Sequence, residues 1–215
     1  MQYTLWLTLL LSLAHCQGHD GNSPKIADVP VQLPPITGQL DSVTNGNTIP
    51  LPIVNTMAHV DYLRLNIGVP PKDTVEVWLR SVGLGAGNPF CSAAVSYSLD
   101  VGGVTSPVVR SGLARNFVYK TPKALHIKAD DVYKQVATVP AGSIVVYQRG
   151  ETKYGHNGFV TADMTGNEGV YISANTSAPG SGGSESAGGG VWEKPFKINP
   201  YGYFRVTDFV LVSYE

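Results

Sequence analysis

The chain has 215 residues, 43% of them hydrophobic and 14% charged, so it can bury one ordinary core after some terminal sequence is set aside. It carries 15 Lys and Arg against 16 Asp and Glu. This balance leaves no large cationic field for a phosphate backbone and argues against nucleic acid as a partner. The 24 Gly and 15 Pro favour short strands and turns, so we expect an α+β fold rich in β-structure.

The N-terminus holds an apolar run at residues 5–14, which has the length of a signal-peptide core and is too short to span a bilayer. We read residues 1–16 as a secretion signal, although no Lys or Arg precedes the apolar run. Two outcomes are open: cleavage near Ala14 or Cys16, or lipid attachment to Cys16, because LAHC loosely resembles a lipobox. The protein is therefore predicted to be exported, to the periplasm, the cell surface or the medium.

A segment rich in Pro, Gly, Asn and Thr follows at residues 17–54 and shows no sustained period, as is typical of a linker or arm. The folded domain is expected at residues 55–215. Apolar residues at three- and four-residue steps predict two short helices, separated by Pro70-Pro71 and ending at Gly83.

A third helix is predicted from Pro89 to about Leu99. Asn88 can cap it, and Pro89 suits its first position because Pro lacks the N–H that would be unpaired there. Cys91 then falls in the first turn of this helix.

Strand patterns dominate the second half of the chain. Residues 124–136 are compatible with either a strand or a short helix, and residues 178–190 form a Gly/Ser-rich loop. Apolar or alternating segments separated by Gly, Asn and Pro turns predict an antiparallel sheet of at least four strands. These segments are residues 143–149, 156–164, 168–176 and 204–214.

The chain has two cysteines, of which Cys16 is lost with the signal or lipidated. Cys91 is then an unpaired thiol in an oxidising compartment, where it is either a buried small hydrophobe or a functional group. The position of Cys91 in the first turn of a helix favours a functional role. The free N–H groups of a first turn stabilise a thiolate and can also bind an oxyanion.

A catalytic thiol also needs an imidazole that takes up its proton and returns it to the leaving amine. His156 begins a predicted strand after a turn, a position from which a sheet can aim a side chain at a helix terminus. The alternative is a solvated surface histidine. Asn175, one strand further on, could accept the other N–H of the imidazole, or it could simply begin a turn.

Four segments, taken together, resemble the CHAP-like and NlpC/P60-like peptidoglycan hydrolases. GLGAGNPFCSAAVSYSL is similar to the nucleophile segment, PAGSIVVYQRG to the strand that follows it, and GHNGFVT to the strand that carries the histidine. YISANTSAPGSGGSESAGGGVWEKPF is similar to the segment in which Asn opens a Gly/Ser loop before a Gly-Val strand. The resemblance runs from about residue 55 to residue 214, with the motifs in the family's order.

This resemblance implies a papain-like fold, with short N-terminal helices packed on an antiparallel sheet and the nucleophile at a helix N-terminus. It implies Cys91 as nucleophile, His156 as general base and Asn175 as the orienting residue of an enzyme that cleaves a peptidoglycan amide through a thioester. No metal or organic cofactor is expected, because His and Cys are too few and too scattered for a metal-ligand spacing. Two positions depart from the pattern. Ser173 replaces a Glu found in many relatives, and Ser143 stands where the strand often begins with Asp.

Two alternatives to the hydrolase are kept. One is a cell-wall-binding module that retains the fold and has lost turnover, which the missing carboxylate at Ser173 makes conceivable. The other is a cysteine acyltransferase or deamidase that acts on another amide with the same three residues. The sequence therefore predicts the cysteine hydrolase and leaves open whether it cleaves the N-acetylmuramoyl-L-alanine amide or a bond within the peptide.

Overall fold

The computed structural model describes residues 57–184 and 187–214, all of which lie in one compact unit, Pro50–Glu215. The predicted signal peptide at 1–16, the predicted arm at 17–54 and Cys16 lie outside the described residues.

Helices come first along the described chain. The two predicted helices on either side of Pro70-Pro71 are confirmed, and the proline pair separates them as expected, because Pro cannot continue a helix. In the described part of the chain, no helix is long and apolar enough to cross a membrane. The helices are α1 (Ala58–Arg64), α2 (Lys72–Ser81), α3 (Cys91–Val101), α4 (Asn116–Tyr119), the single 3₁₀ turn η1 (Lys123–Leu125) and α5 (Ala129–Tyr133).

The third predicted helix forms, but its start differs from the prediction. α3 begins at Cys91 instead of Pro89, Phe90 is its N-cap residue, and no side chain caps it. The Asn88 amide nitrogen instead donates a hydrogen bond to the carbonyl oxygen of Gly85, at 2.9 Å. Asn88 therefore closes the Gly-rich turn before the helix, and the expected cap is wrong.

The sheet has six strands in the order β1-β6-β2-β3-β4-β5, and every neighbouring pair is antiparallel. The four predicted strands are confirmed, and the ambiguous segment at 124–136 contains both a short strand and a short helix. The strands are β1 (His126–Lys128), β2 (Ile144–Arg149), β3 (Gly155–Val160), β4 (Glu168–Thr176), β5 (Gly190–Lys197) and β6 (Phe204–Val210). The α+β class is thus as expected.

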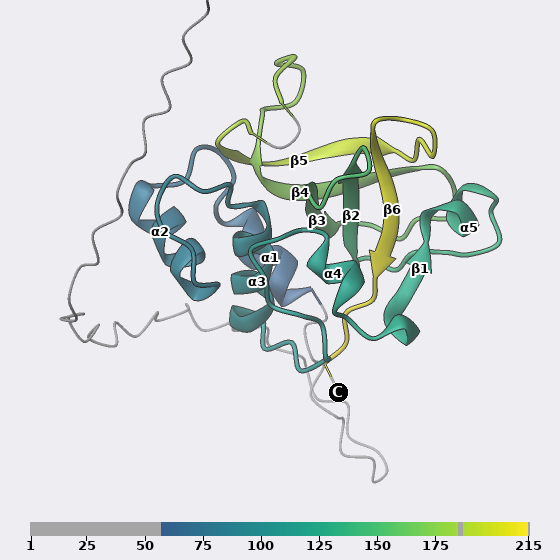
Figure 1. Ribbon diagram of the computed structural model, residues 1–215, viewed down its shortest axis with the longest axis horizontal. Coiled ribbons are helices and arrows are strands. Elements are labelled where there is room, and N and C mark those ends of the chain that lie inside the picture. Colours follow the sequence, from purple (N-terminus) through teal and green to yellow (C-terminus); the bar gives the residue numbers. More distant parts are fainter. Residues whose placement is uncertain (1–56, 185–186, 215) are drawn as a thin grey trace, which may run out of the picture. The chain divides into compact units, whose positions relative to one another are not determined.

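Both faces of the central strands are buried. Figure 1 shows α1, α2 and α3 gathered on one side of the sheet, with α5 beside β1 at the other end. Ile144, Val146 and Phe159 pack with the residues of α1 to α3 in one apolar cluster. Val145 and Val160 belong to a second cluster on the opposite face, which includes residues of α5. In β2 and β3, successive residues therefore alternate between the two clusters.

Gly158 lies where β3 passes close to β4. A Cβ atom at this position would stand 2.3 Å from the carbonyl oxygen of Ile172, which is backbone and cannot rotate away. We expect Gly158→Ala to lower the free energy of unfolding by at least about 2 kcal/mol, because overpacking forces the strands apart. Gly166→Ala is the control, since a Cβ there meets nothing within 4 Å. Urea denaturation of both variants tests this, and equal stability would contradict it.

Candidate functional site

Cys91 is the first residue of α3 and lies at the edge of a pocket of about 220 Å³. The pocket is bounded by the start of α3, by residues 112–114 and by the turn between β2 and β3 at residues 149–155. The Cys91 side chain is 5% exposed, so only a small part of it reaches the pocket. The predicted placement of Cys91 in the first turn of a helix is confirmed.

Burial decides the protonation of the thiol. It raises the pKa of Cys91 above its ordinary value, while weaker hydrogen bonds from the Ser92 hydroxyl and from backbone groups of Ser92, Asn157 and Cys91 itself lower it. The Ser92 hydroxyl lies 3.7 Å from the Cys91 sulfur. Since the burial effect is the largest, the neutral thiol is favoured near neutral pH, which is the opposite of what a nucleophile requires.

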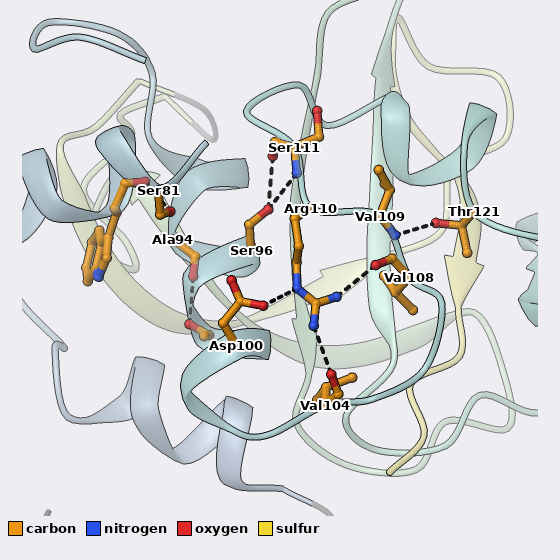
Figure 2. Close-up of polar contacts among 12 residues, drawn as sticks. Ser81, Ala94, Ser96, Asp100, Val104, Val108, Val109, Arg110, Ser111 and Thr121 are labelled. Carbon is orange, nitrogen blue, oxygen red and sulfur yellow. Dashed lines mark hydrogen bonds and ion pairs between the residues drawn. The ribbon is translucent and has the colours of Figure 1, made fainter. Parts of the chain in front are cut away.

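The pocket wall at residues 112–114 is preceded by a segment that is hydrogen-bonded to α3. Figure 2 shows these contacts for Arg110 and Ser111. The Ser111 amide donates to the Ser96 hydroxyl at 2.9 Å, and that hydroxyl donates to the Ser111 carbonyl at 3.1 Å. Arg110 donates to the Asp100 carboxylate at 2.6 Å and to the carbonyl oxygens of Val108 and Val104 at 2.8 and 3.0 Å. The wall is therefore positioned by hydrogen bonds to the middle and end of α3.

His156 lies on the opposite face of the sheet from Cys91. It pairs with Tyr147 in the β2–β3 register, and its ring contacts Tyr147, Tyr171 and Phe204 at centroid distances of 6.0, 6.4 and 6.3 Å. All three belong to, or pack against, the cluster on the face away from α3. The expectation that the sheet aims His156 at the helix terminus is therefore wrong.

The environment of His156 keeps the imidazole neutral. Its side chain is completely buried, and neither ring nitrogen has a hydrogen-bond partner among the described residues. Burial, with smaller effects from the charges of Lys194 and Arg149, lowers its pKa from 6.5 to about 3. An imidazole of this kind is a poor proton acceptor near pH 7, whatever its position.

Asn157 occupies the place on β3 that the prediction gave to the histidine. It shares a face with Phe159, which packs against the helices, and its side-chain oxygen accepts a hydrogen bond from the Ser92 hydroxyl at 3.2 Å. Its amide nitrogen is buried and has no partner among the described residues. This residue could not be predicted from the sequence, because His156 is an even number of positions from Val160, just as Asn157 is from Phe159.

Asn175 lines a second pocket together with Val75 and Phe90, the residue before α3. It is not hydrogen-bonded to His156, because the ring nitrogens of His156 have no hydrogen-bond partner among the described residues. It sits at a bulge in β4 with a φ of 59°. The predicted orienting contact between Asn175 and His156 is therefore not formed.

Two further histidines are described, and neither lines the pocket beside Cys91. The ring nitrogens of His59 lie 2.5 Å from the Tyr214 hydroxyl and 2.8 Å from the Gly142 carbonyl oxygen. His126 lies on β1, with its Nδ1 atom 4.0 Å from the Asp208 carboxylate. Among residues 57–184 and 187–214, the Cys91 pocket thus has no imidazole in its lining.

The chain was also compared with known proteins. No family model and no curated protein matches it. The likeness to CHAP-like hydrolases therefore stays a prediction from the four motifs and their order.

Proposed function

We propose that this protein is an exported peptidoglycan-binding module that has a papain-like, CHAP-related fold and does not hydrolyse its ligand. The observation that carries the proposal is the placement of His156 on the sheet face away from Cys91, among aromatic side chains. Acyl transfer requires a thiolate and a base within hydrogen-bond reach of each other. Here burial favours the neutral thiol and the predicted base lies behind the sheet.

Three observations support peptidoglycan as the ligand. The four sequence motifs follow the order found in peptidoglycan hydrolases, and an apolar run at residues 5–14 favours export to the compartment that holds this polymer. In addition, the pocket lies at the start of α3, where such a hydrolase would bind the amide it cleaves. A protein can keep a binding site after losing the groups that perform the chemistry.

Co-sedimentation with purified, insoluble peptidoglycan tests the proposed function. We expect the wild-type protein to pellet with the polymer and Cys91→Ala to pellet to the same extent, because the thiol acts as a small buried apolar group here. Cellulose is the control polymer, since it offers sugar rings without peptide. Protein that stays in the supernatant with peptidoglycan, or that pellets equally with cellulose, would contradict the proposal.

A further inference from the structure

Three exposed tyrosine side chains surround the turn between β2 and β3. They are Tyr119, Tyr154 and Tyr203, with exposed fractions of 62%, 57% and 69%. Tyr154 belongs to the turn, Tyr119 is the last residue of α4, and Tyr203 directly precedes β6. Three separate segments of the chain therefore supply them.

Side-chain contacts bring these tyrosines to the same turn. The Tyr203 ring packs on Gly150, because a Cβ atom at that glycine would stand 2.6 Å from the Cε2 atom of the ring. The guanidinium carbon of Arg115 lies 5.0 Å from the centre of the Tyr119 ring. The Cδ atom of Arg115 also lies 3.4 Å from the Cβ position of Gly155, at the end of the turn. The three tyrosines thus form one exposed aromatic surface, which we call the tyrosine surface, and such a surface is typical of a binding site.

Cations restrict two of the three rings. Arg115 is 6% exposed and donates a hydrogen bond to the Thr207 hydroxyl on β6 at 2.5 Å, so its contact with Tyr119 ties that ring to the sheet. The ammonium group of Lys153 lies 5.5 Å from the centre of the Tyr154 ring, which is a cation–π contact. Rings that are already restricted lose less conformational entropy when a ligand stacks on them.

A polar pair accompanies the rings. Glu151, in the same turn, accepts a hydrogen bond at 2.6 Å from Arg205, which is two residues after Tyr203. The Glu151 side chain is 84% exposed and that of Arg205 is 25% exposed. The carboxylate can therefore accept further hydrogen bonds and the guanidinium can donate them, while their opposite charges offset each other.

An N-acetylated pyranose offers the groups that complement this surface. The face of a pyranose ring presents C–H groups, which are attracted to the negative face of an aromatic ring. The acetamide group has one N–H donor, one carbonyl acceptor and one methyl group. These match the Glu151 carboxylate, the Arg205 guanidinium and a tyrosine ring, respectively. A chain of such sugars repeats the same groups and can contact several rings at once.

The tyrosine surface is continuous with the Cys91 pocket. Tyr154 and Lys153 belong to both, because they also line that pocket. A polymer whose peptides branch from its sugars can therefore place sugar rings on the tyrosine surface and a peptide in the pocket.

We infer that the tyrosine surface binds the glycan strand of the polymer by stacking on its N-acetylated pyranose rings, with Tyr154 and Tyr203 as the main contacts. The inference rests on the proposed function and assigns the sugar part of the ligand to a surface outside the Cys91 pocket. The acetamide groups distinguish this strand from cellulose, whose rings carry hydroxyl groups in their place.

Isothermal titration calorimetry of the full-length protein with soluble oligosaccharides tests the inference. The probe is the β-linked hexamer of N-acetylglucosamine, and cellohexaose is the comparison, because it has the same linkage without acetamide groups. We expect the N-acetylated hexamer to bind at least about tenfold more tightly than cellohexaose. Tyr154→Ala and Tyr203→Ala should each weaken its binding several-fold, because each removes a stacking ring. Tyr203→Phe keeps the ring and should bind as the wild type does.

Tyr133→Ala is the control variant, because Tyr133 is also exposed but lies on α5, whose buried residues belong to the apolar cluster on the face away from α3. It should bind the N-acetylated hexamer as the wild type does. Equal binding of the two hexamers, or full binding by both alanine variants of the tyrosine surface, would overturn the inference. A wild-type dimer in analytical ultracentrifugation that Tyr203→Ala separates would also overturn it, since a second copy would then cover this surface.

Co-sedimentation with peptidoglycan, measured in parallel, separates this inference from the proposed function. Protein that pellets with peptidoglycan but does not bind the N-acetylated hexamer refutes only the role of the tyrosine surface. Protein that binds the hexamer but does not pellet refutes only the proposed function.

Discussion

Lowering the pH from 6.5 to 5 is expected to lower the free energy of unfolding by about 2 kcal/mol, and His156→Phe is expected to remove most of that loss. The pKa of His156 is lowered from 6.5 to about 3 in the folded protein. Between these values the unfolded chain binds a proton that the folded chain does not, so stability falls as the pH falls, by about 1.4 kcal/mol per pH unit. Well above pH 6.5 the histidine is neutral in both states and the effect disappears.

The substitution suits this site because the ring nitrogens of His156 have no hydrogen-bond partner among the described residues and the ring packs against aromatic side chains. An apolar ring leaves no donor or acceptor unpaired, so stability at pH 7.5 should be unchanged or higher. Burial also lowers the pKa of His59, so a smaller loss with the same sign should persist in the variant.

Urea denaturation at pH 7.5, 6.5, 5.5 and 5 measures the effect. The same titration of wild type and of His156→Phe gives the difference that belongs to His156. A pH dependence that survives in His156→Phe, or a variant that unfolds at pH 7.5, would show that His156 is not a neutral core residue.

The second large effect concerns the reactivity of Cys91. In a Cys16→Ser background, iodoacetamide at pH 7 should alkylate the folded protein at least about 100-fold more slowly than the urea-unfolded chain. Cys91 is 5% exposed and burial raises the pKa of its thiol, so both the access of the reagent and the thiolate fraction are reduced. The rate should rise with pH above 9, as the thiolate forms.

Asn157→His tests whether an imidazole on the correct face of β3 would activate the thiol. The side chain at position 157 is hydrogen-bonded to the hydroxyl of Ser92, the residue after Cys91 in α3. An imidazole there would stand on the Cys91 face and stabilise a thiolate, so alkylation of the folded variant should be at least about tenfold faster than that of the wild type. His156→Phe should leave the wild-type rate unchanged. Rapid alkylation of the wild type that His156→Phe abolishes would mean that His156 activates the thiol after all.

The helices and most strands could be predicted because their signals are local. The apolar spacing around Pro70-Pro71 and the Gly and Pro turns between strands each act within a few residues. β5 was expected only from the family resemblance, because its sequence contains Pro195 and three charged residues. It lies at an edge of the sheet, where a missing backbone N–H is tolerated.

The face on which His156 lies could not be predicted in the same way. In β3, residues 156–160 are buried on both faces, so no alternation of polar and apolar residues distinguishes one face from the other. A shift of one position along a strand moves a side chain to the other face of the sheet. Because the motif GHNGFV has polar residues at both 156 and 157, the sequence does not indicate which of the two faces the helices. Tertiary packing of Phe159 against the helices decides the outcome and brings Asn157 to the thiol.

Mass spectrometry of the soluble products, after prolonged incubation with purified peptidoglycan, tests the proposal that this protein does not hydrolyse the polymer. Wild-type protein, Cys91→Ala and a known muramidase are compared at equal protein concentration from pH 5 to 9. We expect wild type and Cys91→Ala to release the same background of fragments across this range, while the muramidase releases muropeptides. Fragments with newly formed amino and carboxyl ends that appear with the wild type and are absent with Cys91→Ala would contradict it.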